Sequence, residues 1–258
     1  MRPLRLVLAV AILACAFPAQ SLAASATIVA VENKDVVRQA QNPNDDIVRC
    51  RMYWGKTATV RGLVTRDDGA PAAGVTLTLY RQFADPTDPS GYKTVPVGLP
   101  LVTDAEGRWE RKIKPDRITY YYVSAAPQPE LGIAAQTASP QVGLMIAPRL
   151  LQTSDAHQKG ATFKVTGRVL MASARSFGRI VVERLKGTAA ERKGTTVPNA
   201  DGTFALKLRH DKNGTYRYRL SYRPLPKYAA RLIASSVIFS ITVTSIEPEP
   251  PAGGQPTP

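Results

Sequence analysis

Apolar and polar residues alternate with a period of two in several short segments of the chain. The clearest of these segments are residues 75–79, 163–169, 204–208 and 237–243. Clusters of Gly, Pro, Asn and Asp separate the segments, and no long stretch shows the 3.6-residue period of an amphipathic helix. This pattern predicts an all-β protein built from half-buried antiparallel strands.

Three short motifs occur twice, in the same order, and divide the chain into two units. Residues 58–64 match 163–169, residues 104–109 match 199–204, and residues 118–120 match 214–216. Corresponding motifs lie about a hundred residues apart, which suits a sandwich of seven or so short strands. The sequence therefore predicts two tandem Ig-like antiparallel β-sandwich domains. The first unit is longer, and its extra residues are expected within 82–100.

One repeated motif is a tight turn followed by an aromatic residue. Gly107 and Gly202 end the two turns, where a positive φ is expected. Trp109 and Phe204 then begin a strand, and we expect each of them to pack in the core of its unit.

Two further repeated positions have expected structural roles. Gly62 and Gly167 interrupt strands, which indicates a bulge or a close approach of another chain segment. Tyr120 and Tyr216 are expected to be corner tyrosines, whose ring packs inside while the hydroxyl binds the preceding loop.

In these motifs the chain resembles the exported Ig-like repeat domains of bacteria. That family reads as a Gly-x-Val strand, a Gly-x-Pro-x-x-Gly turn, a Val-x-Leu strand, an Asp-x-x-Gly-x-aromatic hairpin and a Thr-Tyr strand. The first unit supplies all five, as residues 62–64, 69–74, 75–79, 104–109 and 119–120. The second unit keeps the hairpin and the Tyr strand, but residues 172–176 replace the Gly-Pro turn. The resemblance spans 55–245 and implies a surface adhesin, a spacer or an accessory module of a secreted enzyme.

Residues 1–23 are expected to be an export signal. Arg2 and Arg5 precede a short apolar segment, and the small residues that follow favour cleavage before Ala24. Cys15 offers a second interpretation, as a lipid-anchored N-terminus, although cleavage there would leave a very short apolar segment. The protein is therefore expected to be secreted or held at the cell surface, without a transmembrane segment.

The expected domains are residues 24–148 and 149–245, followed by a flexible Pro-rich tail at 246–258. Residues 24–54 contain one expected strand, around Thr27 to Val31, which would be the first strand of the first domain. Cys50 is the only cysteine outside the signal. We expect it to be a small buried hydrophobic residue, with pairing to another molecule as the alternative.

The chain of 258 residues has 34 Lys and Arg against 20 Asp and Glu, a formal charge of +14. Hydrophobic residues make up 44%, which is typical of a folded protein. Removing Arg2 and Arg5 with the signal lowers the charge from +14 to +12. Such an excess favours an anionic partner, but export argues against nucleic acid and favours a polyanion of the cell envelope or of a host.

No pattern typical of an enzyme is present in the sequence. The two histidines, His157 and His210, are expected in surface loops beside Asp residues, and no Gly-x-Ser-x-Gly motif occurs. The turns at 104–107 and 199–202 resemble pieces of a calcium loop but lack its further ligands. We therefore expect no catalytic residues, no metal and no cofactor.

The strongest local signal is a basic segment between Tyr216 and Arg231. By alternation, its Tyr and Leu residues face one side of a strand and its Arg residues face the other. The candidate polyanion-binding residues are Arg217, Arg219, Arg223, Lys227 and Arg231. Two interpretations stay open: a solvated outer face over an aromatic core, or a stripe that binds anionic groups through Arg.

Together these features predict a non-enzymatic exported protein that acts as a surface binding, adhesion or spacer module. Its partner would be a protein, or a glycan or polyanion of the cell envelope. One alternative is a basic binder of envelope or host polyanions. Another is an accessory or inhibitory subunit that joins a secreted enzyme through an exposed sheet edge.

Overall fold

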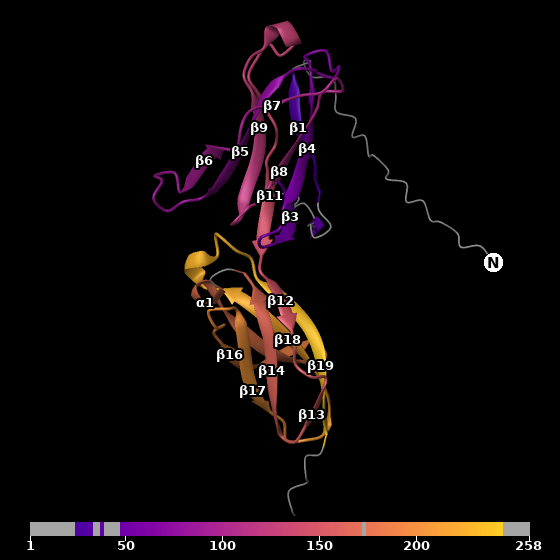
Figure 1. The fold of residues 1–258 in the computed structure, drawn as a ribbon, viewed down its shortest axis with the longest axis vertical. Coiled ribbons are helices and arrows are strands. Elements are labelled where there is room, and N and C mark those ends of the chain that lie inside the picture. Colours follow the sequence, from indigo (N-terminus) through magenta and orange to yellow (C-terminus); the bar gives the residue numbers. More distant parts are fainter. Residues whose placement is uncertain (1–23, 33–36, 39–46, 172–173, 245–258) are drawn as a thin grey trace, which may run out of the picture.

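The computed structural model describes residues 24–32, 37–38, 47–171 and 174–244. The expected export signal, Cys15 and the Pro-rich tail lie outside these residues. The described chain folds into two β-sandwiches placed end to end, so the prediction of an all-β, Ig-like fold is confirmed (Figure 1).

The first sandwich consists of two sheets. The smaller sheet has the order β1 (Ser25–Glu32), β4 (Ala58–Thr65), β8 (Arg108–Ile113). The larger sheet has the order β2 (Val37–Arg38), β3 (Val48–Tyr53), β11 (Val142–Ala147), β9 (Thr119–Ala125), β5 (Thr76–Ala84), β6 (Tyr92–Pro96). Three short elements complete it: β7 (Leu101–Val102) on β5, β10 (Thr137–Ala138) on β9, and the 3-10 turn η1 (Pro129–Leu131).

The second sandwich repeats this plan. Its smaller sheet has the order β12 (Arg149–Gln152), β14 (Thr162–Leu170), β17 (Thr203–Arg209). The larger sheet has the order β13 (His157–Lys159), β19 (Ser235–Thr244), β18 (Gly214–Pro224), β15 (Gly178–Lys186), β16 (Ala189–Thr196). The short helix α1 (Ala174–Phe177) precedes β15, and the 3-10 turn η2 (Pro226–Tyr228) follows β18.

Each larger sheet contains one parallel pair, which the alternating pattern does not predict. Strand β3 runs parallel to β11, and β13 runs parallel to β19. In both units the N-terminal segment contributes to both sheets. Its first strand, β1 or β12, pairs antiparallel in the smaller sheet. A later strand, β3 or β13, pairs in parallel with β11 or β19 in the larger sheet. This switch gives both units the same Ig-like strand order.

The two mid-strand glycines lie under the two core aromatic residues, as the close-approach interpretation predicts. Gly62 pairs with Trp109 and Gly167 pairs with Phe204. A Cβ atom at either glycine would lie 2.3 Å from the ring of its partner. Both rings are only 4% exposed. The same glycine–aromatic contact therefore anchors the core of each sandwich.

The repeated tight turns also have the predicted geometry. Gly107 has a φ of 70° and Gly202 a φ of 84°. In the first turn the Asp104 carboxylate accepts the backbone N–H groups of Glu106 and Arg108, at 3.0 and 2.8 Å. Turn chemistry thus explains the acidic residue at this position.

The corner-tyrosine prediction is confirmed in the second unit and wrong in the first. The Tyr216 hydroxyl donates to the Lys212 carbonyl at 2.6 Å, which ties down the preceding loop. In β9, however, Thr119 and Tyr121 are buried and Tyr120 lies on the outer face. The spacing that relates Gly107 to Gly202 also relates Tyr121, not Tyr120, to Tyr216, so the motif match was displaced by one residue.

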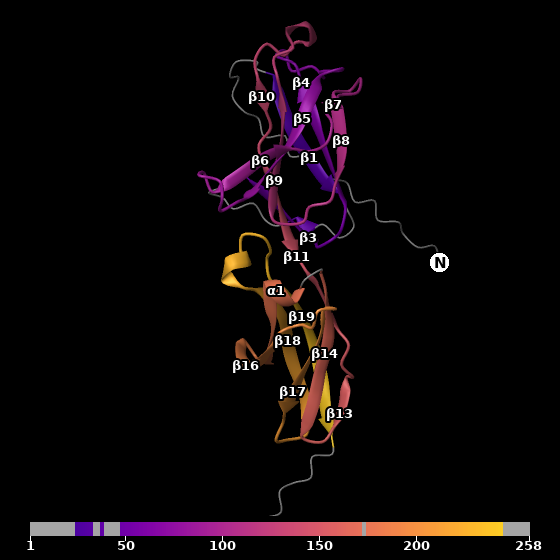
Figure 2. The same cartoon turned by 60° about the vertical axis from the view of Figure 1, so that its left-hand side comes forward.

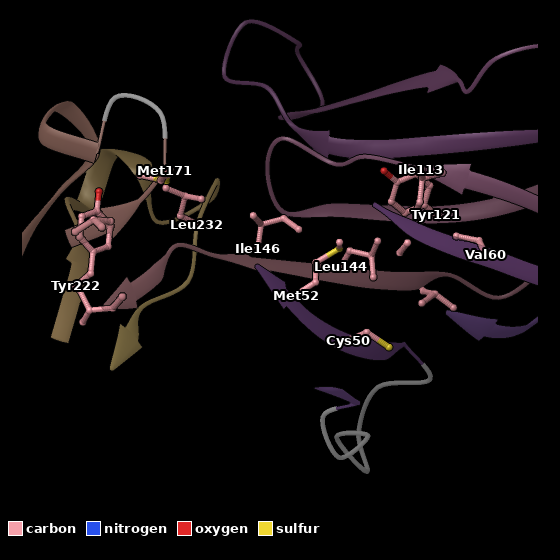
Figure 3. Close-up of a cluster of buried hydrophobic side chains, with 14 of the residues drawn as sticks. Cys50, Met52, Val60, Ile113, Tyr121, Leu144, Ile146, Met171, Tyr222 and Leu232 are labelled. Atoms are coloured by element: carbon pink, nitrogen blue, oxygen red, sulfur yellow. The ribbon is translucent and has the colours of Figure 1, made fainter. Parts of the chain in front are cut away.

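The two sandwiches meet through a short, buried junction. Strand β11 is buried along its whole length and ends at Ala147, and a single residue, Pro148, separates it from β12. Ile146 lies between the core of the first domain and Leu232 and Met171 of the second (Figure 3). The Ile233 N–H also donates to the Ile146 carbonyl at 2.9 Å, which links the two domains through the backbone.

Cys50 is buried in the core of the first domain, with 5% of its surface exposed. This agrees with the expectation of a small buried hydrophobic residue.

Candidate functional site

Strand β18 belongs to the larger sheet of the second domain (Figure 2). The predicted arginines of this strand lie on the outer face of that sheet. On its inner side, Tyr218, Leu220 and Tyr222 are fully buried. On its outer side, Arg217 is exposed and Arg219 is half-buried. The alternation predicted for this strand is therefore confirmed.

The neighbouring strand β15 adds two charged residues that sequence reasoning missed. In the register of the sheet, Arg179 lies opposite Arg223 and Glu183 lies opposite Arg219. Between these pairs, Val181 and Ser221 face each other and are 2% and 6% exposed. We call Arg179, Arg217, Arg219 and Arg223 the basic face.

Glu183 is held between two of these arginines. Its carboxylate accepts a hydrogen bond from Arg219 Nε and another from Arg223 Nη2, both at 2.8 Å. Burial alone raises the pKa of the Glu183 carboxyl, but the hydrogen bond from Arg219 and the positive charges of both arginines outweigh it and hold that pKa below its usual range. Glu183 is therefore ionised at neutral pH and fixes the two guanidinium groups side by side.

The last two predicted residues, Lys227 and Arg231, lie in the loop between β18 and β19 rather than on the strand. Lys227 belongs to η2, where its Nζ atom lies 5.0 Å from the centre of the Tyr228 ring. Arg231 is exposed, and its carbonyl accepts the Ile118 N–H at 2.8 Å across the domain junction. The structure thus divides the predicted stripe into a strand part and a junction part.

His210 corrects one prediction, because it is buried rather than part of a surface loop. It is 3% exposed, and its ring stacks on Tyr216 and Phe163 with centroids 3.5 and 5.0 Å away. Its Nε2 atom also contacts the Tyr218 hydroxyl. Burial lowers the pKa of His210, and the charges of nearby basic residues add to this effect. His157, by contrast, is exposed as expected, but it begins strand β13 rather than lying in a loop.

Two other features of the described residues bear on function. Within the described ranges, no three His, Cys, Asp or Glu side chains are grouped so that they could hold a metal ion. None of the helices in this part of the chain is long and apolar enough to cross a membrane.

No family model matches the chain, and no curated protein is similar to it in sequence. Among solved structures it is similar to native alpha-2-macroglobulin of E. coli, with 8% identity and a TM-score of 0.31, over 82% of this chain and 17% of that one. A marsupial T cell receptor matches with 10% identity and a TM-score of 0.31, over 91% of this chain and 76% of the receptor chain. Dimeric latent PorU from Porphyromonas gingivalis matches with 11% identity and a TM-score of 0.27, over 86% of this chain and 24% of PorU. The chain thus spans a small part of the macroglobulin and PorU chains.

Proposed function

We propose that this protein is an exported, non-catalytic binding protein, similar in kind to bacterial Ig-like repeat proteins, and that its second domain binds an anionic polymer. The observation that supports this most directly is the basic face. It combines four arginines on two adjacent strands with a single acidic residue, Glu183, at the facing positions of β15 and β18. The polymer would be a component of a cell envelope or of a host surface.

The chemistry of the basic face suits such a ligand. A guanidinium group presents several N–H donors in one plane and binds phosphate, sulfate or carboxylate oxygens in pairs. Alternate residues of a strand are about 6.6 Å apart, and adjacent strands about 4.8 Å apart. The four side chains can therefore contact successive charged groups of one extended chain.

Charge reversal on the basic face tests this proposal against a matched control. The double variant Arg179→Glu/Arg217→Glu changes two exposed residues that no described ion pair involves. The control Lys164→Glu/Lys207→Glu makes the same change in net charge at two exposed, facing positions of the smaller sheet. We expect the first variant to lose binding to polyphosphate and heparin at low salt, and the control to retain most of it.

Salt dependence provides the second readout. Binding by the wild-type protein should weaken steeply as ionic strength rises, because the interaction depends on exposed charges. Equal losses in both variants would indicate attraction by net charge alone and would contradict a site on the basic face.

The accessory-subunit alternative depends on an open sheet edge. Strand β6 is such an edge, and its residues are mostly exposed. Lys93 and Pro96, however, lie on this strand, and a lysine or proline on an edge strand opposes pairing with another chain. We therefore favour binding through the basic face.

A further inference from the structure

Three tyrosines lie on the outer face of the larger sheet of the first domain. Strands β11, β9 and β5 are consecutive neighbours in this sheet (Figure 1). Tyr120 and Tyr122 of β9 and Tyr80 of β5 share the outer face, where all three are half-buried. Strands β5 and β9 each pair with a neighbour on both sides, so these tyrosines lie in the middle of the sheet and not at its edge.

The packing of the sheet holds the three rings in place. Tyr80 lies opposite Tyr122, and their rings stack with centroids 5.2 Å apart and planes inclined by 17°. Tyr120 lies opposite Gly143 of β11, where a Cβ atom would be 3.0 Å from the Tyr120 ring. The ring therefore occupies space that only a glycine leaves open. Because the rings are ordered without a ligand, binding costs them little conformational entropy.

Two glutamine side chains cross this group of tyrosines. Gln82 belongs to β5 and Gln141 directly precedes β11, so the two residues flank β9. The Gln141 amide donates to the Gln82 carbonyl oxygen at 3.1 Å, which forms a bridge over β9. The bridge leaves the NH2 group of Gln82 and the carbonyl of Gln141 without a partner among the described residues. We call Tyr80, Tyr120, Tyr122, Gln82 and Gln141 the tyrosine face.

The tyrosine face is uncharged, unlike the basic face of the second domain. Where β5 and β9 pair, their outer positions are Thr78, Tyr80, Gln82, Tyr120, Tyr122 and Ser124. The nearest charged residue in the row of Tyr120 is Arg49, which lies beyond Gly143 on β3. The free amide groups consist of one donor and one acceptor, so neither an anion nor a cation is matched by both. A neutral ligand whose groups both donate and accept hydrogen bonds fits this charge pattern.

We propose that the tyrosine face binds an uncharged polysaccharide, with a sugar ring packed on Tyr120 and its hydroxyls bound to Gln82 and Gln141. A sugar hydroxyl both donates and accepts a hydrogen bond, which matches the free NH2 and carbonyl groups of the bridge. The C–H groups of a sugar ring form an apolar surface that packs on an aromatic ring, whose face carries partial negative charge. This ligand is independent of the anionic polymer of the proposed function.

The position of the tyrosine face argues against a peptide as the ligand. An extended peptide that is recognised through its main chain adds to an exposed edge of a sheet. The tyrosine face lies on strands that already have neighbours on both sides, so no edge is open there. A polymer of sugar rings needs only side-chain contacts on the face of the sheet.

An array of neutral and acidic oligosaccharides, probed with the purified protein at low and at high salt, tests the proposal. We expect saturable binding to neutral glycans that is retained at high salt, because uncharged groups make the contacts. Calorimetric titration with the best neutral oligosaccharide then gives its affinity for each variant. The absence of binding to every neutral glycan on the array would overturn the proposal.

Variants of the tyrosine face separate binding from folding. Tyr120→Ala removes the ring and should weaken neutral glycan binding about tenfold, whereas Tyr120→Phe keeps the ring and should bind normally. Gln82→Ala removes one side of the bridge and should also weaken binding. Tyr228→Ala changes a half-buried tyrosine of the second domain and serves as the control, with unchanged affinity for the neutral glycan. Melting curves of each variant verify that it is folded.

The outcomes distinguish this proposal from the proposed function. Equal glycan affinity in Tyr120→Ala and Tyr228→Ala would overturn the tyrosine face as a site. Glycan binding that disappears at high salt and in Arg179→Glu/Arg217→Glu would assign it to the basic face and also overturn the proposal. Neutral glycan binding that survives this double variant would support the tyrosine face, even if no anionic polymer is bound and the proposed function fails.

Discussion

Replacing Glu183 by Gln removes the one acidic group beside the basic face and keeps the size and shape of the side chain. The Glu183 side chain is 12% exposed, while those of Arg219 and Arg223 are 38% and 51% exposed. Exposed ion pairs contribute roughly 0.2–1 kcal/mol, and breaking a buried pair costs about 3–5 kcal/mol. Because Gln keeps one acceptor oxygen, we expect the free energy of unfolding to fall by about 1 kcal/mol.

Binding should change in the opposite direction. Without the Glu183 carboxylate, the two guanidiniums are free to bind the polymer and the basic face gains one net positive charge. We expect polyphosphate affinity at low salt to rise several-fold, and the dependence of log affinity on log salt to become steeper by about one. Loss of stability together with gain of affinity is the signature of a charge that competes with the ligand.

Urea unfolding and polyphosphate titration at several salt concentrations measure the two effects. Glu191→Gln is the control, because it makes the same change in charge on the same β15–β16 hairpin, where Glu191 is paired with Lys186 and not with the arginines of the basic face. If Glu183→Gln binds polyphosphate no better than Glu191→Gln, the arginines held by Glu183 do not contact the polymer, and the reasoning is refuted.

Two further predictions concern the fold. Gly167→Ala would place a Cβ atom 2.3 Å from the Phe204 ring and 2.3 Å from the Leu151 carbonyl oxygen. We therefore expect the free energy of unfolding, measured with urea, to fall by at least about 2 kcal/mol. A loss below about 0.5 kcal/mol would contradict the role of the glycine–aromatic contact as a core anchor. His210 has a pKa below its ordinary value of 6.5, so the unfolded chain binds a proton more readily than the folded one, and stability should fall as pH drops below about 6.5. His210→Gln should flatten this dependence in melting curves recorded between about pH 7 and pH 5, and an unchanged slope would assign it to other groups.

The strands could be predicted where one face of a sheet is buried and the other is not. Strand β4 is an example, since its burial alternates along the whole strand. Strand β11 could not be predicted this way, because both of its faces are buried and its sequence VGLMIA has no alternation. Its parallel partner β3 does alternate, since Arg49 and Arg51 separate Val48, Cys50 and Met52, but this alternation does not reveal that the strand pairs in parallel.

The error at Tyr120 has a related cause. Residues 120–122 are three consecutive tyrosines, which give no sign of the phase of the strand. A shift of one residue moves every side chain of a strand to the opposite face. In β18, arginines alternate with tyrosines, so the phase was unambiguous and the outward position of Arg217 could be predicted.

Alternation within one strand reveals which side chains share a face, but not which residues of the next strand lie beside them. Arg179 and Glu183 reach the basic face from β15, through a register that no local pattern of the sequence encodes. That register matters for function, because Glu183 both orders two guanidiniums and occupies part of their donor capacity. A ligand that binds there has to supply acceptors to the guanidinium N–H donors that Glu183 leaves unused.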